Sequence, residues 1–480
     1  MLLKSCSRAI FIYTICASAA VYNWDVTWVL RNPDGLLTRP VIGINGQWPP
    51  PAIHANVGEQ ITVVLTNQLG NETTGMHFHG FFQEGTNSMD GPTGITQCPI
   101  GPGETFTYIT TVNQYGTYWY HSHNRGQYPD GFRGPIIIHD PQSPHANQYD
   151  EELVLTLSDW YHQQIPDLLG NFLSPTLNTD GAEPIPDSAI INDNATTSFS
   201  VTPGKTYMVR IINVSNFAAF LVKFDQHEMT IVEVDGTYTK AQPTDLIYMS
   251  SAQRMSVLIT AKPNANQNFA FVGAMDPNMF DSDPSTLNLN ATGYLVYDDK
   301  KPLPSTEPTF ASYTDGFFDD FDLVPYDETK LFGPVTKQIT LNVSSGTYFN
   351  QNRFAINNIS YVEPKVPTLY TVMSVGEAAT NPAVYGEYSS PQIVNFNDVV
   401  EVVINNSDDG GHPVHMHGHN FQMIERSPTS AGVYGGTSTG APATPIRRDV
   451  IKVNGGGYLV YRFVADNPDK STLSPQIDIN

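Results

Sequence analysis

Residues 116–123 read Gly-Thr-Tyr-Trp-Tyr-His-Ser-His, a short aromatic run that begins on glycine and ends on two histidines one residue apart. Other short runs are β-branched or alternate in polarity, and Gly, Pro, Asn and Asp lie between them; they cover residues 61–65, 207–212, 255–259, 399–404 and 458–464. Helical periodicity is scarce along the chain. Short strands separated by turns predict an all-β protein built from β-sandwiches.

The length of the chain indicates several such sandwiches. Its 480 residues are enough for about three domains of roughly 150 residues each. Turn-rich segments follow the strand-like runs that end near residues 140 and 297, and a mixed segment covers residues 311–334. We therefore expect three β-domains over residues 21–141, 142–300 and 301–480, with a linker at the start of the third.

The first twenty residues have the features of a cleaved secretion signal. Lys4 and Arg8 supply a positive start, residues 9–20 are apolar or small, and residues 17–19 have the small-x-small form of a signal-peptidase site. The apolar run is too short to span a bilayer, which takes about 20 residues. Sequons of the form Asn-x-Ser/Thr agree with export and predict a glycoprotein; they begin at Asn71, Asn194, Asn213, Asn290, Asn342, Asn358 and Asn405.

The charge balance of the chain is acidic. The formal net charge is -23, and loss of Lys4 and Arg8 with the signal would take it to about -25. Such a balance argues against nucleic acid or an anionic membrane surface as a partner. It permits a cationic substrate, although an acidic surface also serves solubility alone.

Histidines gather in three His-x-His pairs, 77/79, 121/123 and 415/417, and His412 precedes the last pair by three residues. In a strand, residues i and i+2 project from the same face, so each pair presents two imidazoles on one side. A single pair is usually incidental, but three pairs indicate a metal site, and imidazole-rich sites suit copper or zinc. We expect the remaining histidines to be surface or core residues: His54, His139, His145, His162, His227 and His419.

Five motifs in a fixed order resemble the signatures of the multicopper oxidase family. They are His-Phe-His-Gly at 77, Met-Asp-Gly at 89, Thr-Gln-Cys-Pro-Ile at 96, the run at 116–123, and His-Pro-Val-His-Met-His-Gly-His at 412. The resemblance extends from about Trp24 to Pro468. It implies three cupredoxin-like domains, which agrees with the count of β-sandwiches, and copper as the cofactor.

The resemblance also implies a role for each matching residue. His77 and His415 match the ligands of the type 2 copper, and His412 matches one ligand of the type 1 copper. Four ligands of the binuclear type 3 pair match His79, His121, His123 and His417. Asp90 matches an acid that helps deliver protons where oxygen is reduced; the alternative is a turn residue before Gly91.

Within the family, the chain resembles the fungal iron-transport ferroxidases more than the phenol-oxidising laccases, through residues 157–162, 183–186, 227–230 and 362–369. By that resemblance Glu183, Asp281 and Asp408 match the carboxylates that bind Fe²⁺. Anionic oxygens favour Fe³⁺ over Fe²⁺ and so ease electron loss. Only Asp408 has a local signal, because it lies four residues before His412; Asp409 is a possible substitute, and a solvated surface carboxylate is the alternative for each.

The match to the family ends near Pro468. The family continues with His-Cys-His-x-x-x-His, whereas residues 469–480 contain no His, Cys or Met. Cys98 matches a position that is disulfide-bonded in relatives to a partner near the C-terminus. We therefore expect a truncated third domain with an open sheet edge, an incomplete type 1 site, and no C-terminal anchor, so that this chain would be secreted or lumenal where its relatives lie at the plasma membrane.

Three functions remain open from the sequence. The first is an Fe²⁺ oxidase that reduces O₂ to water and feeds Fe³⁺ to an iron permease. The second is a laccase-like phenol oxidase. The third is a catalytically inactive copper-binding remnant, because the segment that completes the copper sites is not found.

Overall fold

The computed structural model describes residues 19–282, 287–313, 316, 318–438, 440–467 and 473–474. Residues 1–18 of the expected signal peptide lie outside this description, as do residues 468–472 and 475–480. Ala19, which we expected in the signal, belongs to a strand, β1 (Ala19–Arg31), that pairs in parallel with β4 (Gln60–Asn67). Among the described residues, no helix combines the length and the apolarity needed to cross a membrane.

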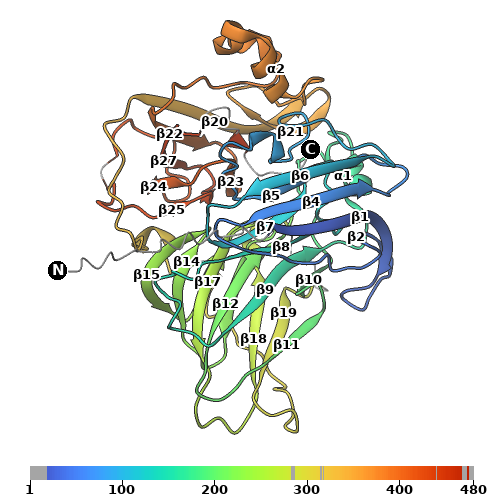
Figure 1. The fold of residues 1–480 in the computed structure, drawn as a ribbon, viewed down its shortest axis with the longest axis vertical. Coiled ribbons are helices and arrows are strands. Elements are labelled where there is room, and N and C mark those ends of the chain that lie inside the picture. The colour runs from blue at the N-terminus through green and yellow to red at the C-terminus, as the bar shows by residue number, and fades with distance from the viewer. Residues whose placement is uncertain are drawn as a thin grey trace, which may run out of the picture.

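Three units of two sheets each follow one another along the chain, and the second lies below the other two in Figure 1. The all-β prediction is therefore confirmed. In the first unit the sheets have the strand orders β2-β1-β4-β6 and β3-β8-β7-β5. Besides β1 and β4, its elements are β2 (Arg39–Ile44), β3 (Ile53–Asn56), β5 (Met76–His79), the 3-10 helix η1 (Asn87–Met89), β6 (Thr105–Thr111), β7 (Gly116–Ser122) and β8 (Arg133–His139).

The second unit has the larger pair of sheets, with the orders β10-β9-β12-β17-β14-β15 and β11-β19-β18-β13-β16. Its elements are β9 (Glu151–Trp160), α1 (Ile165–Phe172), β10 (Ser188–Ile191), β11 (Thr196–Ser200), β12 (Thr206–Asn213), β13 (Phe220–Phe224), β14 (Met229–Val234), β15 (Thr237–Thr244), β16 (Ile247–Met249), β17 (Arg254–Thr260), β18 (Phe269–Met275), η2 (Pro277–Met279) and β19 (Asn290–Val296).

The third unit has the orders β21-β20-β22-β27-β24-β25 and β26-β23-β28, and α2 projects from its outer end in Figure 1. The linker before it carries η3 (Asp320–Asp322). The other elements are β20 (Lys337–Tyr348), β21 (Gln351–Ile356), α2 (Thr368–Ser374), η4 (Gly376–Thr380), η5 (Pro382–Tyr385), β22 (Val399–Asn406), β23 (His412–Met416), β24 (Phe421–Arg426), β25 (Arg447–Arg448), β26 (Val450–Val453), β27 (Tyr458–Val464) and β28 (Leu473–Ser474).

Alternating burial along the strands builds the cores. In β4, for example, Ile61, Val63 and Leu65 are fully buried while the residues between them face outward, as expected for a strand with one face on a core. The first unit has its own apolar cluster, whereas one continuous cluster extends from the second unit into the third. The third unit is thus packed firmly on the second, and its strand β23 is held at the border with the first.

One of the expected sequons is inaccessible in the folded chain. Asn213 is fully buried at the end of β12, and its amide donates to the carbonyls of Ala218 and Met249 at 3.0 Å each. A glycan needs a surface position, so Asn213 cannot carry one in this fold. Cys98 is exposed and has no disulfide partner among the described residues.

Candidate metal centre

The three His-x-His pairs come together where the first and third units meet. Strands β5 and β7 are antiparallel neighbours, and their register places His77 opposite His121. Strand β23 of the third unit brings His415, with His417 just after its end. The ring centroids of His77 and His417 are 4.1 Å apart, and those of His79 and His415 are 3.7 Å apart.

These imidazoles are removed from solvent. The rings contributed by β5, β7 and β23 are almost completely buried, at most 2% exposed, namely His77, His79, His121, His415 and His417. His123 is half-buried and lies 5.6 Å from the ring of His417, centroid to centroid. The structure therefore gathers six of the seven histidines predicted to bind metal into one cluster.

Three of the rings are oriented by backbone carbonyls. The Nδ1 atoms of His77, His121 and His415 lie 2.8, 3.0 and 2.8 Å from the carbonyl oxygens of Asp90, Ser122 and Asp449, respectively. A carbonyl can only accept, so each Nδ1 donates and the lone pair sits on Nε2. These three Nε2 atoms are buried and have no hydrogen-bond partner among the residues that the structure describes.

A buried acceptor without a partner is costly, and a metal ion would satisfy it. Two groups have ligand atoms within 4.8 Å of one another: His77, His79 and His415, and His77, Asp90 and His417. Neutral imidazoles fixed through their second nitrogen are the usual first ligands of copper and zinc. The donor set and its geometry thus fit the copper that the sequence predicts.

Burial also keeps the imidazoles neutral. It lowers the pKa of His79, His121 and His415 well below the usual range, and neighbouring imidazoles lower it further. Burial lowers the pKa of His417 to about 3, although the adjacent Asp90 acts in the opposite direction. At neutral pH these rings are therefore in the unprotonated form that a metal requires.

Asp90 lies inside the cluster. Its Oδ2 is 3.0 Å from Nδ1 of His417, and its Oδ1 is 3.4 Å from Nδ1 of His77. The turn that places it depends on Gly91, whose φ is +104° and where a Cβ atom would lie 1.7 Å from the carbonyl oxygen of Met76. Asp90 is therefore a turn residue that also contacts two of the predicted ligands.

The seventh histidine forms a second, smaller cluster with carboxylates. Nε2 of His412 on β23 is 2.9 Å from Oδ2 of Asp408, whose Oδ1 accepts from the hydroxyl of Ser345 at 2.8 Å. Burial opposes ionisation of Asp408, but these hydrogen bonds hold its pKa below the usual value. Asp409 is exposed, so the carboxylate beside the histidine is that of Asp408 and not the alternative.

Glu183 interacts electrostatically with His412 and with the other two predicted iron carboxylates, Asp281 and Asp408. Glu183 lies in the segment between α1 and β10, and Asp281 follows η2. Burial raises the pKa of Glu183. The carboxylates of Asp281 and Asp408 also raise it, whereas His412 lowers it. The three predicted iron carboxylates, which are far apart in the sequence, thus share one electrostatic environment.

The remaining histidines make other contacts. They interact with backbone carbonyls, carboxylates, a tyrosine hydroxyl or each other: His54 with His139, His145 with the Thr239 carbonyl, His162 with Asp34, His227 with Tyr297, and His419 with Asp466.

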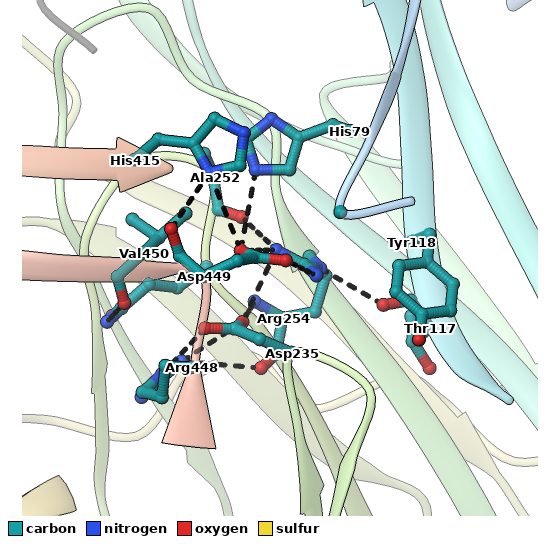
Figure 2. Close-up of polar contacts among 12 residues, drawn as sticks. His79, Thr117, Tyr118, Asp235, Ala252, Arg254, His415, Arg448, Asp449 and Val450 are labelled. Carbon is teal, nitrogen blue, oxygen red and sulfur yellow. Dashed lines mark hydrogen bonds and ion pairs between the residues drawn. The ribbon is translucent and has the colours of Figure 1, made fainter. Parts of the chain in front are cut away.

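Sequence reasoning missed the charged residues beneath the cluster. Asp449 lies between β25 and β26, and its Oδ1 is 3.6 Å from Nε2 of His79. Its carboxylate is paired with Arg254 at the start of β17 (Figure 2). The available signal was a run of three charged residues, 447–449, set between the apolar residues Ile446 and Val450.

Family models described as multicopper oxidase match residues 25–143, 151–300 and 361–479. The chain is 50% identical over 459 residues to the iron transport multicopper oxidase fetC of Epichloe festucae, with 94% of this chain and 73% of that protein covered. It is 44% identical over 462 residues to the iron transport multicopper oxidase FET3 of Saccharomyces cerevisiae, with 94% and 72% covered.

Solved structures of multicopper oxidases also match this chain. The crystal structure of Fet3p, a multicopper oxidase that functions in iron import, matches with a TM-score of 0.90 at 43% identity over 94% of this chain and 86% of that one. A laccase from Botrytis aclada matches with a TM-score of 0.82 at 29% identity over 96% and 85%.

Proposed function

The chain belongs to the multicopper oxidase family, and we propose that it oxidises Fe²⁺ to Fe³⁺ for iron uptake while O₂ is reduced to water. The observation that carries this proposal is the contact between Asp408 and His412, with Glu183 and Asp281 in the same electrostatic environment. Similarity to iron transport oxidases supports it independently.

On the iron side, the carboxylates do the binding and orienting. Oxygen anions stabilise Fe³⁺ more than Fe²⁺, so a site of this kind lowers the cost of removing an electron. Asp408 joins that site to His412 through a single 2.9 Å hydrogen bond. Its second oxygen is held by Ser345, which fixes the carboxylate in place between the substrate and the histidine.

On the oxygen side, the buried histidines would hold copper. Bound copper would supply one-electron redox chemistry, so that the electrons of four Fe²⁺ ions could be collected and used, with four protons, to reduce one O₂ to two waters. We assign His77 and His415 to the type 2 copper, and His412 to the type 1 copper. Four ligands of the type 3 pair are assigned to His79, His121, His123 and His417. Asp90 Oδ2, against His417, is placed to hold or release the protons that water formation consumes.

The cellular setting is part of the proposal. The apolar leader of residues 1–20 supports entry into the secretory pathway, and the exposed sequons at Asn71, Asn194, Asn342 and Asn358 support glycosylation there. We propose that the protein works in the secretory pathway, in its lumen or after secretion, and passes Fe³⁺ to an iron permease in the membrane.

Replacing Asp408 or Glu183 with alanine tests the iron site. Each change is expected to lower kcat/KM for Fe²⁺ about 10- to 100-fold, because one contact to a charged group contributes about 1.5–3 kcal/mol and 1.4 kcal/mol is tenfold. Oxidation of a phenol by the same variants should change little. Steady-state O₂ consumption with each substrate gives both values.

Asp409→Ala is the matched control, because Asp409 is an exposed neighbour of Asp408 that lies outside the cluster. It should oxidise both substrates at the normal rate. If the Asp408 and Glu183 variants kept full activity on iron, the site would not bind iron and a laccase-like phenol oxidase would be favoured.

The pH dependence of iron binding should follow Glu183. Burial and the nearby carboxylates raise the pKa of this side chain, so it takes up a proton at a higher pH than an ordinary glutamate as the solution is acidified. Protonated Glu183 no longer attracts Fe²⁺. As the solution is acidified, KM for iron should therefore start to increase while the pH is still above 4.5, the ordinary pKa of a glutamate. In Glu183→Gln that step should disappear and KM should be high throughout; an identical profile in both proteins would contradict the assignment.

A further inference from the structure

Arg254 is held at every nitrogen. Its Nη1 and Nη2 each donate to one carboxylate oxygen of Asp449 at 2.6 Å, so the ion pair is bidentate. Its Nε donates to the carbonyl of Thr117 at 3.0 Å, and Nη1 also donates to the carbonyl of Ala252 at 3.2 Å. Figure 2 shows the guanidinium between Asp449 and Thr117. The side chain is completely buried and therefore fixed.

These partners come from all three units. Thr117 lies on β7 of the first, Ala252 precedes β17 of the second, and Asp449 precedes β26 of the third. The second unit provides none of the histidines of the buried cluster. Through Arg254, however, it joins the strand β7, which carries His121, to the segment that carries Asp449.

Asp449 in turn contacts two histidines of the cluster from different units. Its carbonyl accepts from Nδ1 of His415 at 2.8 Å, and its Oδ1 lies 3.6 Å from Nε2 of His79. The two rings stack on each other at 17°. One residue therefore orients His415 by a hydrogen bond and faces His79 with a negative charge (Figure 2).

The glycine after His79 packs on the same ion pair. Gly80 has a φ of +92°, and a Cβ atom there would lie 2.6 Å from Nη2 of Arg254 and 2.7 Å from Oδ2 of Asp449. The turn that ends β5 thus rests directly on the Arg254–Asp449 pair, so the position of that pair and the position of His79 depend on each other.

We propose that Arg254 is a positioning residue for the copper ligands His79 and His415, and that it acts through Asp449. Groups that hold the far side of a metal-bound imidazole typically change metal affinity 10- to 100-fold when they are altered. This inference rests on the copper assignment of the proposed function. It adds that the second unit, which holds no ligand of the buried cluster, sets the geometry of that cluster.

Arg254→Lys is the primary test. Lysine keeps the positive charge but cannot form the planar bidentate pair. We expect copper retention against a competing chelator to weaken about 10- to 100-fold, and the electron paramagnetic resonance signal of the bound copper to change. Arg39→Lys is the control, because Arg39 is a buried arginine paired with Asp130 at 2.8 Å in the first unit. It should retain copper and give the normal signal.

The thermal midpoint of each copper-free variant separates positioning from general destabilisation. If Arg254→Lys does not fold, Asp449→Asn decides: it keeps the carbonyl that orients His415 but removes the charge that Arg254 holds, and it should also weaken copper retention. Copper retention and spectra equal to those of the Arg39→Lys control in the variants that fold would overturn this inference alone. If the unsubstituted protein bound no copper, the proposed function would be overturned as well.

Discussion

His77→Ala is expected to abolish most of the oxygen chemistry. The ring of His77 lies within 6.0 Å, centroid to centroid, of five other histidine rings, and it belongs to both groups of atoms that could hold a metal ion. Alanine removes the one imidazole that both of these groups contain. We expect copper content to fall and O₂ consumption to drop about 10²- to 10³-fold, the range found when one group of a preorganised site is removed. Metal analysis and an oxygen electrode measure both.

The control for this change is His145→Ala. His145 is also buried, but its Nε2 contacts the carbonyl of Thr239, away from the cluster. It should cost stability without any loss of copper. Full copper content and normal O₂ consumption in the His77 variant would remove His77 from the ligand set.

The histidine pairs could be predicted from the sequence because side chains alternate along a strand. His77 and His79 on β5 are therefore both turned into the interior, as is His415 on β23; His417 follows the end of β23 and is buried beside them. The register that sets His77 opposite His121 could not be predicted, because it is determined by the pairing of strands about 40 residues apart in the sequence. Local periodicity predicted the histidine pairs, and the packing of the first unit against the third brings them into one cluster.

The three predicted iron carboxylates also differ in how far the sequence alone could indicate them. Asp408 had a local signal in its spacing from His412, and the structure joins the two directly. Glu183 and Asp281 lie in irregular segments of the second unit, where no periodicity specifies a direction. For these two, the family resemblance was the whole basis of the prediction.

The sequence did not indicate which charged residues are buried. Arginine and aspartate are almost never fully buried unless they are paired, so residues such as Arg254 and Asp449 are read from a sequence as solvated. These two residues are each other's partner, but they lie almost 200 positions apart in the sequence. No local pattern connects them. The same limitation applies to Asn213, whose sequon is sound as a motif but lies inside the fold.

Arg448→Met should produce a large loss of stability. Arg448 is fully buried and donates to Asp235 through Nε at 2.7 Å and to Asp320 through Nη1 at 3.0 Å. It thereby ties β25 of the third unit to the second unit and to the linker. Methionine fills similar space but leaves both carboxylates without this partner, and breaking a buried ion pair in that way costs about 3–5 kcal/mol. The loss should appear as a lower denaturation midpoint of the copper-free protein.

The adjacent residue provides the control, because Arg447 occupies the same strand and differs mainly in solvent exposure. It pairs with Asp327, which is half-exposed, at 2.7 Å. Water and salt already screen that pair, so Arg447→Met should change stability by only about 0–1 kcal/mol. Equal losses in the two variants would mean that removing any arginine from β25 weakens the third unit. A large loss at Arg448 alone would show that the interior carboxylates require it, and hence that the second and third units are joined by charge as well as by their common apolar core.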